Sequence, residues 1–132
     1  MLLVVGVAGC RGGLGRGSYV KANVHLFQQL PSFPGARLDG ETSTAYRSSE
    51  VGPVVGYGTR FDLSLPRAAT TAGVSFFFRQ RLRSQWRLVE VIEGRVFNFR
   101  SGKALVSINL DNAHVHVLEI GVDHAYYGKL GR

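Results

Sequence analysis

Apolar side chains alternate with small or polar ones along much of this chain, and the longest such run covers residues 55–65. There Tyr57, Thr59, Phe61 and Leu63 are separated by glycine, arginine and aspartate. Successive side chains of a β-strand point to opposite faces, so this period of two predicts a half-buried strand. Shorter runs that alternate, or that are rich in β-branched and aromatic residues, predict further strands over 20–26, 74–79, 86–92, 96–99, 104–110 and 114–120.

Short turn sequences separate the later runs. The pairs Glu93-Gly94, Ser101-Gly102 and Asp111-Asn112 are typical of hairpin connections, so residues 74–120 are expected to form a meander of short strands. We therefore predict an all-β fold of about seven or eight short antiparallel strands, arranged as a two-sheet sandwich or jelly roll. A small, partly open β-barrel is the alternative.

The chain has 132 residues, which is close to the commonest size of one domain. We predict a basic, glycine-rich arm over residues 1–18 and a single β domain over residues 19–132. Within that domain, Pro31, Pro34 and Pro53 bracket a segment rich in glycine, serine and threonine, which predicts a long loop over residues 28–53. A loop of that length in a small domain is usually functional.

Charge is the strongest functional signal. The chain carries 16 Lys and Arg, of which 13 are Arg, against 9 Asp and Glu, for a net charge of +7. Arginine binds phosphate and carboxylate groups in a bidentate manner, so an anionic partner is expected: RNA, DNA, anionic lipid or an acidic protein surface. The alternative is that a GC-rich genome has enriched arginine without a functional cause.

Two basic segments, residues 1–38 and 73–103, carry most of these positive charges. If residues 79–83 form a strand, Arg79, Arg81 and Arg83 share one face, and Phe77 and Trp86 nearby could stack on bases. The alternative is an ordinary solvated strand face. The predicted nucleic-acid or anion contacts are Arg11, Arg16, Arg79, Arg81, Arg83, Arg87, Arg95, Arg100 and Lys103.

The glycine-rich stretch over residues 6–17 follows an apolar run, as a dinucleotide-binding loop does. No Gly-Lys-Ser/Thr ending of a phosphate-binding loop is present, and no alternation of strands and helices follows. A basic arm that lies along RNA or against a neighbouring subunit is the favoured interpretation, and we predict no cofactor.

Two histidines, His114 and His116, are spaced to point to the same side of a strand, with Glu119 close behind. This pattern resembles the first motif of cupins, which implies a metal site, although the glutamate is closer than in that motif. We predict no metal and regard these three residues as candidates only. No pattern of nucleophile and base is present in the sequence, and no close pair of acids suggests glycosidase chemistry, so we do not expect an enzyme.

The single cysteine, Cys10, excludes a disulfide within the chain and favours an intracellular, reducing compartment. No apolar run has the length of a transmembrane helix. Residues 1–38 contain arginine and no acid, a composition typical of mitochondrial transit peptides, so the mitochondrial matrix is one compartment considered.

Two local patterns support the β class. The run Val74-Ser75-Phe76-Phe77-Phe78-Arg79 followed by Trp86-Arg87-Leu88 resembles laminin-G and other concanavalin-type sandwiches, which implies a lectin-like fold. Residues 91–120 resemble an S1-type RNA-binding barrel. Each resemblance covers less than a third of the chain, and they imply different folds.

The first functional hypothesis is a non-enzymatic structural subunit of a large assembly that binds RNA or an acidic partner through the basic arm and the arginine-rich strands. A mitochondrial ribosome, a respiratory complex or a viral shell would fit this role. The alternatives are a lectin-like ligand-binding β-sandwich module and a cupin-like metal-binding protein.

Overall fold

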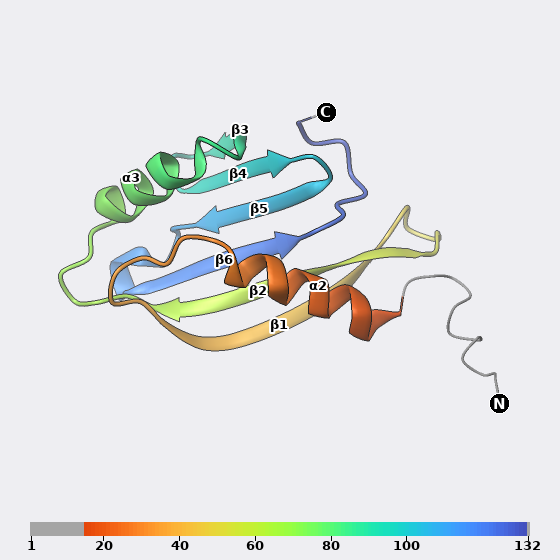
Figure 1. Cartoon of the computed structure of the whole chain (residues 1–132), viewed down its shortest axis with the longest axis horizontal. Coiled ribbons are helices and arrows are strands. Elements are labelled where there is room, and N and C mark those ends of the chain that lie inside the picture. Colours follow the sequence, from red (N-terminus) through yellow and green to blue (C-terminus); the bar gives the residue numbers. More distant parts are fainter. Residues whose placement is uncertain (1–14, 132) are drawn as a thin grey trace.

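The computed structural model describes residues 15–131, which form one six-stranded antiparallel sheet and two α-helices. The elements in chain order are α2 (Arg16–Gln28), β1 (Arg37–Arg47), β2 (Val54–Ser64), α3 (Thr71–Leu82), β3 (Arg87–Ile92), β4 (Val96–Ser101), β5 (Ala104–Asn109), the 3₁₀ turn η1 (Ala113–Val115) and β6 (Val117–Asp123). The strand order is β1-β2-β6-β5-β4-β3, so the last strand inserts between the β1–β2 hairpin and the β3–β4–β5 meander (Figure 1).

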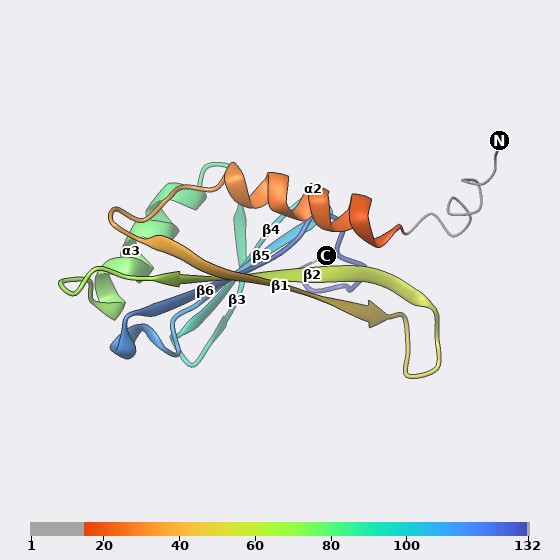
Figure 2. The same ribbon diagram turned by 90° about the horizontal axis from the view of Figure 1, so that it is seen from below.

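The fold is mostly β, as predicted, but the prediction of two stacked sheets is wrong for the described residues. Both helices lie on one face of the single sheet and take the place of the second sheet (Figure 2). Helix α2 covers β2 and β6, where the ring of Phe27 stacks on Phe61 at 3.8 Å between centroids. Helix α3 lies over the β3–β4 end, where Arg79 stands 5.5 Å from the ring of Phe97. Neither helix has the length and hydrophobicity to cross a bilayer.

Helix α3 replaces a predicted strand. Its buried residues Val74, Phe78 and Leu82 recur every four positions and bury one helical stripe against the sheet. Thr70 begins the helix, because its side-chain oxygen accepts a hydrogen bond from the Gly73 N–H at 3.0 Å. The alternation of apolar residues over 74–79 indicated a strand, but this segment also satisfies the helical period.

The strand predicted over residues 20–26 is likewise wrong, since these residues belong to α2. The two fully packed positions of this helix, Tyr19 and Asn23, lie one turn apart and face the sheet. The helix also takes residues 16–18 from the predicted arm, and the rest of that arm, residues 1–14, lies outside the described part of the chain. The predicted loop over 28–53 contains the eleven-residue strand β1, which pairs with β2 along nearly its whole length.

The remaining strands and turns follow the alternation. The hairpin turns at Glu93-Gly94 and Ser101-Gly102 are confirmed: Glu93, Gly94 and Gly102 adopt positive φ angles of 52°, 68° and 58°. The strand predicted over 114–120 begins only at Val117, because residues 113–115 form η1 and His116 takes a left-handed conformation.

Strand pairing sorts the side chains onto two faces. Phe61, Ile120, Ile108 and Phe97 occupy one cross-strand row, are buried, and face the helices. The next row, Arg60, Gly121, Ser107 and Asn98, therefore points to the opposite face, which neither helix covers. We call this second surface the open face. The molecule thus presents two different surfaces, a helical face and an open face.

Candidate anion-binding surface

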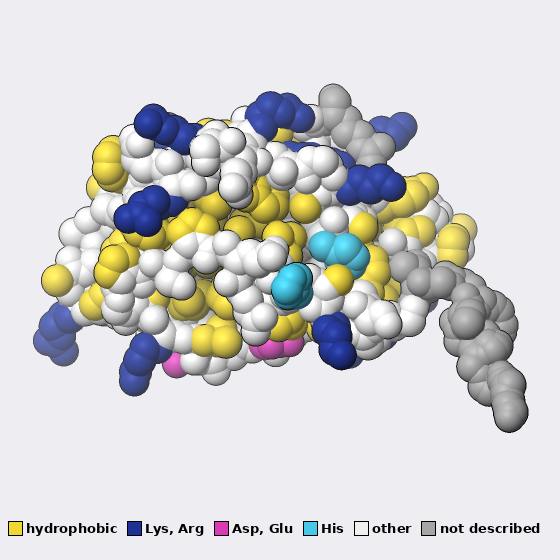
Figure 3. All heavy atoms as spheres, viewed as in Figure 1, with side chains coloured by type: hydrophobic (Ala, Val, Ile, Leu, Met, Phe, Trp, Pro, Cys, Tyr) yellow, Lys and Arg dark blue, Asp and Glu magenta, His cyan; other side chains and the backbone are white. Residues whose placement is uncertain are grey.

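The helical face carries cations without acids. Neither α2 nor α3 contains Asp or Glu, whereas Arg16, Lys21, Arg79 and Arg81 lie on them and Arg83 ends α3. All five residues are exposed. In Figure 3, Lys and Arg are spread over this face, and the visible Asp and Glu lie only at its lower border.

Few of these charges are neutralised within the molecule. Among residues 15–131, the one ion pair is Arg60 with Asp62, at 3.1 Å on the open face. Arg79 and Arg81 lie in the last turn of α3, where a cation interacts favourably with the helix dipole. That effect explains why cations are placed there, but it does not explain why the first turns of both helices lack the acids that the same dipole would favour.

A groove between α3 and the edge of the sheet gathers two of the predicted arginines. It has a volume of about 750 Å³ and is lined by Arg79 and Arg83 together with Phe76, Trp86 and Leu88. Positions 79 and 83 lie one helical turn apart, so both guanidinium groups reach the same groove. Phe76 is 65% exposed and Leu88 is 38% exposed, so exposed apolar side chains line the groove together with its two arginines.

The predicted common face of three arginines is wrong. Because residues 79–82 are helical and not extended, Arg81 points away from the groove and lies over the ring of Phe77 at 4.9 Å. Arg16 stands at the start of α2, 5.9 Å from the centre of the Tyr57 ring. These two residues contribute charge to the helical face but do not line the groove.

Two predicted contacts hold the C-terminal segment in place. Arg100 is 3% exposed and donates hydrogen bonds to the carbonyls of Gly102 at 3.1 Å and Leu130 at 2.7 Å, while its guanidinium lies over the Tyr126 ring. Arg87 donates to the carbonyl of Gly131. Arg100 is therefore a structural residue, and no local sequence pattern indicated its burial.

The other predicted contacts are scattered. Arg95 and Lys103 are exposed in the β3–β4 and β4–β5 turns, and neither lines the groove beside α3. Arg11 lies outside the described residues. The predicted anion contacts therefore divide into a helical group, two structural arginines and isolated turn residues.

The candidate metal ligands do not converge. His114 lies in η1, His116 caps it in a left-handed conformation, and Glu119 follows in β6. Glu119 accepts hydrogen bonds from Asn109 at 3.4 Å and Asn112 at 3.5 Å. Within residues 15–131, no group of three His, Cys, Asp or Glu is placed to hold a metal ion.

A buried polar network at one end of the sheet was missed by the sequence analysis. The carboxylate of Asp123, 5% exposed, accepts hydrogen bonds from the hydroxyls of Tyr19 and Tyr46, both at 2.5 Å, and from the Ala125 N–H at 3.1 Å. Burial and the hydrogen bond to Asp123 raise the pKa of Tyr46 to about 12. The same two causes raise the pKa of Tyr19 further. These residues lie up to 104 positions apart, so no local pattern indicates that they meet.

Asn23 forms the second half of this network. Its Nδ2 donates to the Tyr57 carbonyl at 2.8 Å and to Thr59 Oγ1 at 3.1 Å. Its Oδ1 accepts from the backbone N–H of His124 at 2.9 Å and lies 2.7 Å from His124 Nδ1. The network joins α2 to β2 and to the end of β6.

Comparison with known proteins identifies no family: no family model, no curated protein and no solved structure matches this chain.

Proposed function

We propose that this chain is a non-enzymatic binding domain that lies on an anionic lipid surface through its helical face. The observation that carries the proposal is the segregation of charge: both helices lack acids, and their exposed arginines and lysine face outward. Cations close to an anionic membrane surface each contribute about 1 kcal/mol to binding. Several such residues on one face are enough to favour adsorption.

The groove beside α3 offers a lipid surface both charge and an exposed apolar side chain. Phe76 is 65% exposed and lies one helical turn before Arg79, an arrangement in which the ring can enter the headgroup region while the guanidinium groups bind phosphates. A nucleic acid could also use this arrangement, by stacking a base on the ring.

The N-terminal sequence distinguishes the two partners. Residues 1–8 are apolar or glycine throughout and are joined to α2 by a glycine-rich segment that contains Arg11. A bilayer interface accommodates both apolar side chains and neighbouring cations, whereas a nucleic acid offers no apolar phase for a run of this kind. RNA, one of the partners expected from the sequence, would account for the cations alone.

The test is co-sedimentation of the full chain with vesicles of phosphatidylcholine alone or of an equimolar mixture with phosphatidylglycerol. We expect binding to the anionic vesicles only, and binding that weakens as ionic strength rises. The variant Arg79→Gln/Arg83→Gln should lose about 2 kcal/mol, a roughly 30-fold lower partition coefficient. Phe76→Ser should weaken binding at both low and high salt, because its contribution is not screened.

The matched control is Lys103→Gln/Lys129→Gln, which removes the same charge from exposed positions outside the two helices. If both double variants lose affinity equally, net charge and not the helical face causes adsorption, and the proposal fails. It also fails if a single-stranded oligonucleotide binds the full chain more tightly than anionic vesicles at physiological salt, since RNA is then the better partner.

A further inference from the structure

The open face contains a cleft that the proposed lipid contact does not use. It lies over β1, β2, β6 and β5, on the side of the sheet that faces away from α2 and α3, and has a volume of about 380 Å³. This volume is at the small end of the range of ligand pockets. We call it the open-face cleft.

Two glycines within strands make the cleft. Gly58 of β2 and Gly121 of β6 both line it and lie diagonally across the two paired strands. Neither has a positive φ angle, so the backbone does not require glycine at these positions. A Cβ atom at Gly58 would meet no atom within 4 Å, and one at Gly121 would make only an ordinary contact with Ser107 at 3.6 Å.

A neighbouring glycine shows the contrast. A Cβ atom at Gly56 would lie 2.4 Å from the hydroxyl of Tyr46, so packing inside the protein explains that glycine. No such packing explains Gly58. Glycine weakens a strand, and its presence without an internal reason often marks the close approach of a ligand. The space above Gly58 and Gly121 is therefore the part of the cleft where we expect a ligand to bind.

One end of the cleft is rigid and aromatic. Tyr46 and Tyr126 line it, with ring centroids 6.1 Å apart. The hydroxyl of Tyr46 is fixed by donating to Asp123 and by accepting from the Tyr127 N–H at 3.0 Å, while Arg100 lies over the ring of Tyr126. The rings thus offer apolar surface that is held in place.

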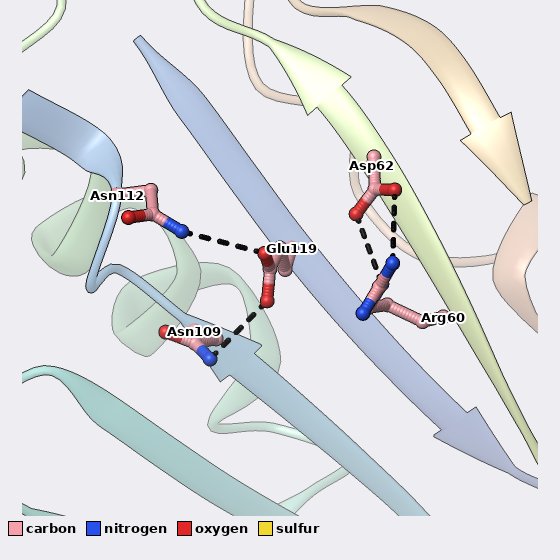
Figure 4. A network of polar contacts seen from close by, with 5 residues as sticks. All are labelled: Arg60, Asp62, Asn109, Asn112 and Glu119. Atoms are coloured by element: carbon pink, nitrogen blue, oxygen red, sulfur yellow. Dashed lines mark hydrogen bonds and ion pairs between the residues drawn. The ribbon is translucent and has the colours of Figure 1, made fainter. Parts of the chain in front are cut away.

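The other end of the cleft is polar and carries a small net negative charge. Arg60 and Glu119 project from adjacent strands, and Asp62 balances the charge of Arg60 (Figure 4). Glu119 makes only long hydrogen bonds, of 3.4 and 3.5 Å, to Asn109 and Asn112, so its oxygens retain capacity to accept. Hydroxyl groups of Thr42 and Ser107 also line the cleft.

From this geometry we propose that the open-face cleft binds a neutral mono- or disaccharide. A sugar ring carries hydroxyls that both donate and accept, which matches Glu119, Asn109 and the threonine and serine hydroxyls. Its apolar C–H face matches a fixed tyrosine ring. The lining holds the carboxylates of Glu119 and Asp123 against the single cation Arg60, and this net negative charge disfavours anionic ligands. This site is on the opposite face from the lipid contact and does not depend on it.

The experiment is isothermal titration calorimetry of the full chain with glucose, galactose, N-acetylglucosamine, maltose, lactose and chitobiose. We expect saturable binding of at least one of these sugars, with an affinity that changes little with ionic strength because the ligand is neutral. Gly58→Leu, which fills the cleft, should lower that affinity by about tenfold or more. Glu119→Gln should also lower it by about tenfold, since a carboxylate accepts stronger hydrogen bonds than an amide.

Gly17→Leu is the matched control, because it adds the same side chain at an exposed glycine of α2 where a Cβ atom also meets nothing within 4 Å. Circular dichroism establishes whether each variant is folded. If Gly58→Leu does not fold, Glu119→Gln alone tests the site. The proposal is overturned if none of the six sugars binds saturably at millimolar concentration. It is equally overturned if the folded cleft variants bind as tightly as Gly17→Leu. Salt-dependent vesicle binding is unaffected by either outcome, so the two proposals fail separately.

Discussion

Asn23 allows the connection between α2 and the sheet to be tested by a single substitution. The side chain is fully buried and uses both donors and both acceptor positions, toward Tyr57, Thr59 and His124. A typical hydrogen bond contributes about 1 kcal/mol net, and a buried partner left without one costs about 1–3 kcal/mol. Asn23→Leu keeps the side-chain volume but leaves the Tyr57 carbonyl and the His124 N–H without their hydrogen-bond partner. We expect the free energy of unfolding to fall by about 3–5 kcal/mol.

Urea denaturation measures this loss, with the fluorescence of the single tryptophan, Trp86, as the probe. With a slope of about 1.5 kcal/mol/M for a domain of this size, the midpoint should fall by roughly 2–3 M at an unchanged slope. Asn112→Ala is the control, because Asn112 is exposed and its side chain bonds only to Glu119 at 3.5 Å, so a change below about 0.5 kcal/mol is expected. A loss below about 1 kcal/mol for Asn23→Leu would show that the helix is not held by this network.

Two further outcomes follow from the buried groups. The free energy of unfolding should fall above pH 10, because tyrosines in the unfolded chain deprotonate near pH 10. In the folded chain the pKa of Tyr46 is raised to about 12 and that of Tyr19 is also raised, so both stay protonated there. Urea midpoints between pH 9 and 11 measure this loss, and a flat profile refutes it. Arg100→Met should speed amide hydrogen exchange of residues 124–131, because it releases the carbonyls of Gly128 and Leu130. Vesicle binding should stay unchanged. A loss of vesicle binding would reassign Arg100 to the lipid surface.

The strands were predictable where alternation is long and one face is buried. Strand β2 alternates over eleven residues, and β6, which pairs with it, and β5 beyond β6 bury every second side chain on the same face. The helices were not predictable, because short segments satisfy two periods at once. In α3, Val74, Phe76 and Phe78 alternate, but the buried set is Val74, Phe78 and Leu82, and only packing against the sheet decides between them.

The candidate sites were harder to predict than the fold, for the same physical reason. Arg79 and Arg83 meet in one groove only because the backbone between them is helical, and a strand would have paired Arg79 with Arg81 instead. The open-face cleft exists because Gly58 and Gly121 have no side chains to fill it. In a sequence, however, glycine indicates a turn as readily as a cleft. Burial of Arg100 depends on the C-terminal segment that folds back over it.

The two proposed surfaces are compatible because the sheet separates them. A chain that lies on lipid through α2 and α3 turns its open face, and the cleft with it, away from the bilayer and toward solvent. The structural link between the two faces is the carboxylate of Asp123, which accepts hydrogen bonds from Tyr19 of α2 and from Tyr46 at the end of the cleft. Since β6 stops pairing with β2 at Val122, Asp123 can be reached from both sides of the sheet. A tight hydrogen-bonded link of this kind holds the helical layer and the aromatic end of the cleft in one fixed arrangement, so that each surface is preorganised for its partner.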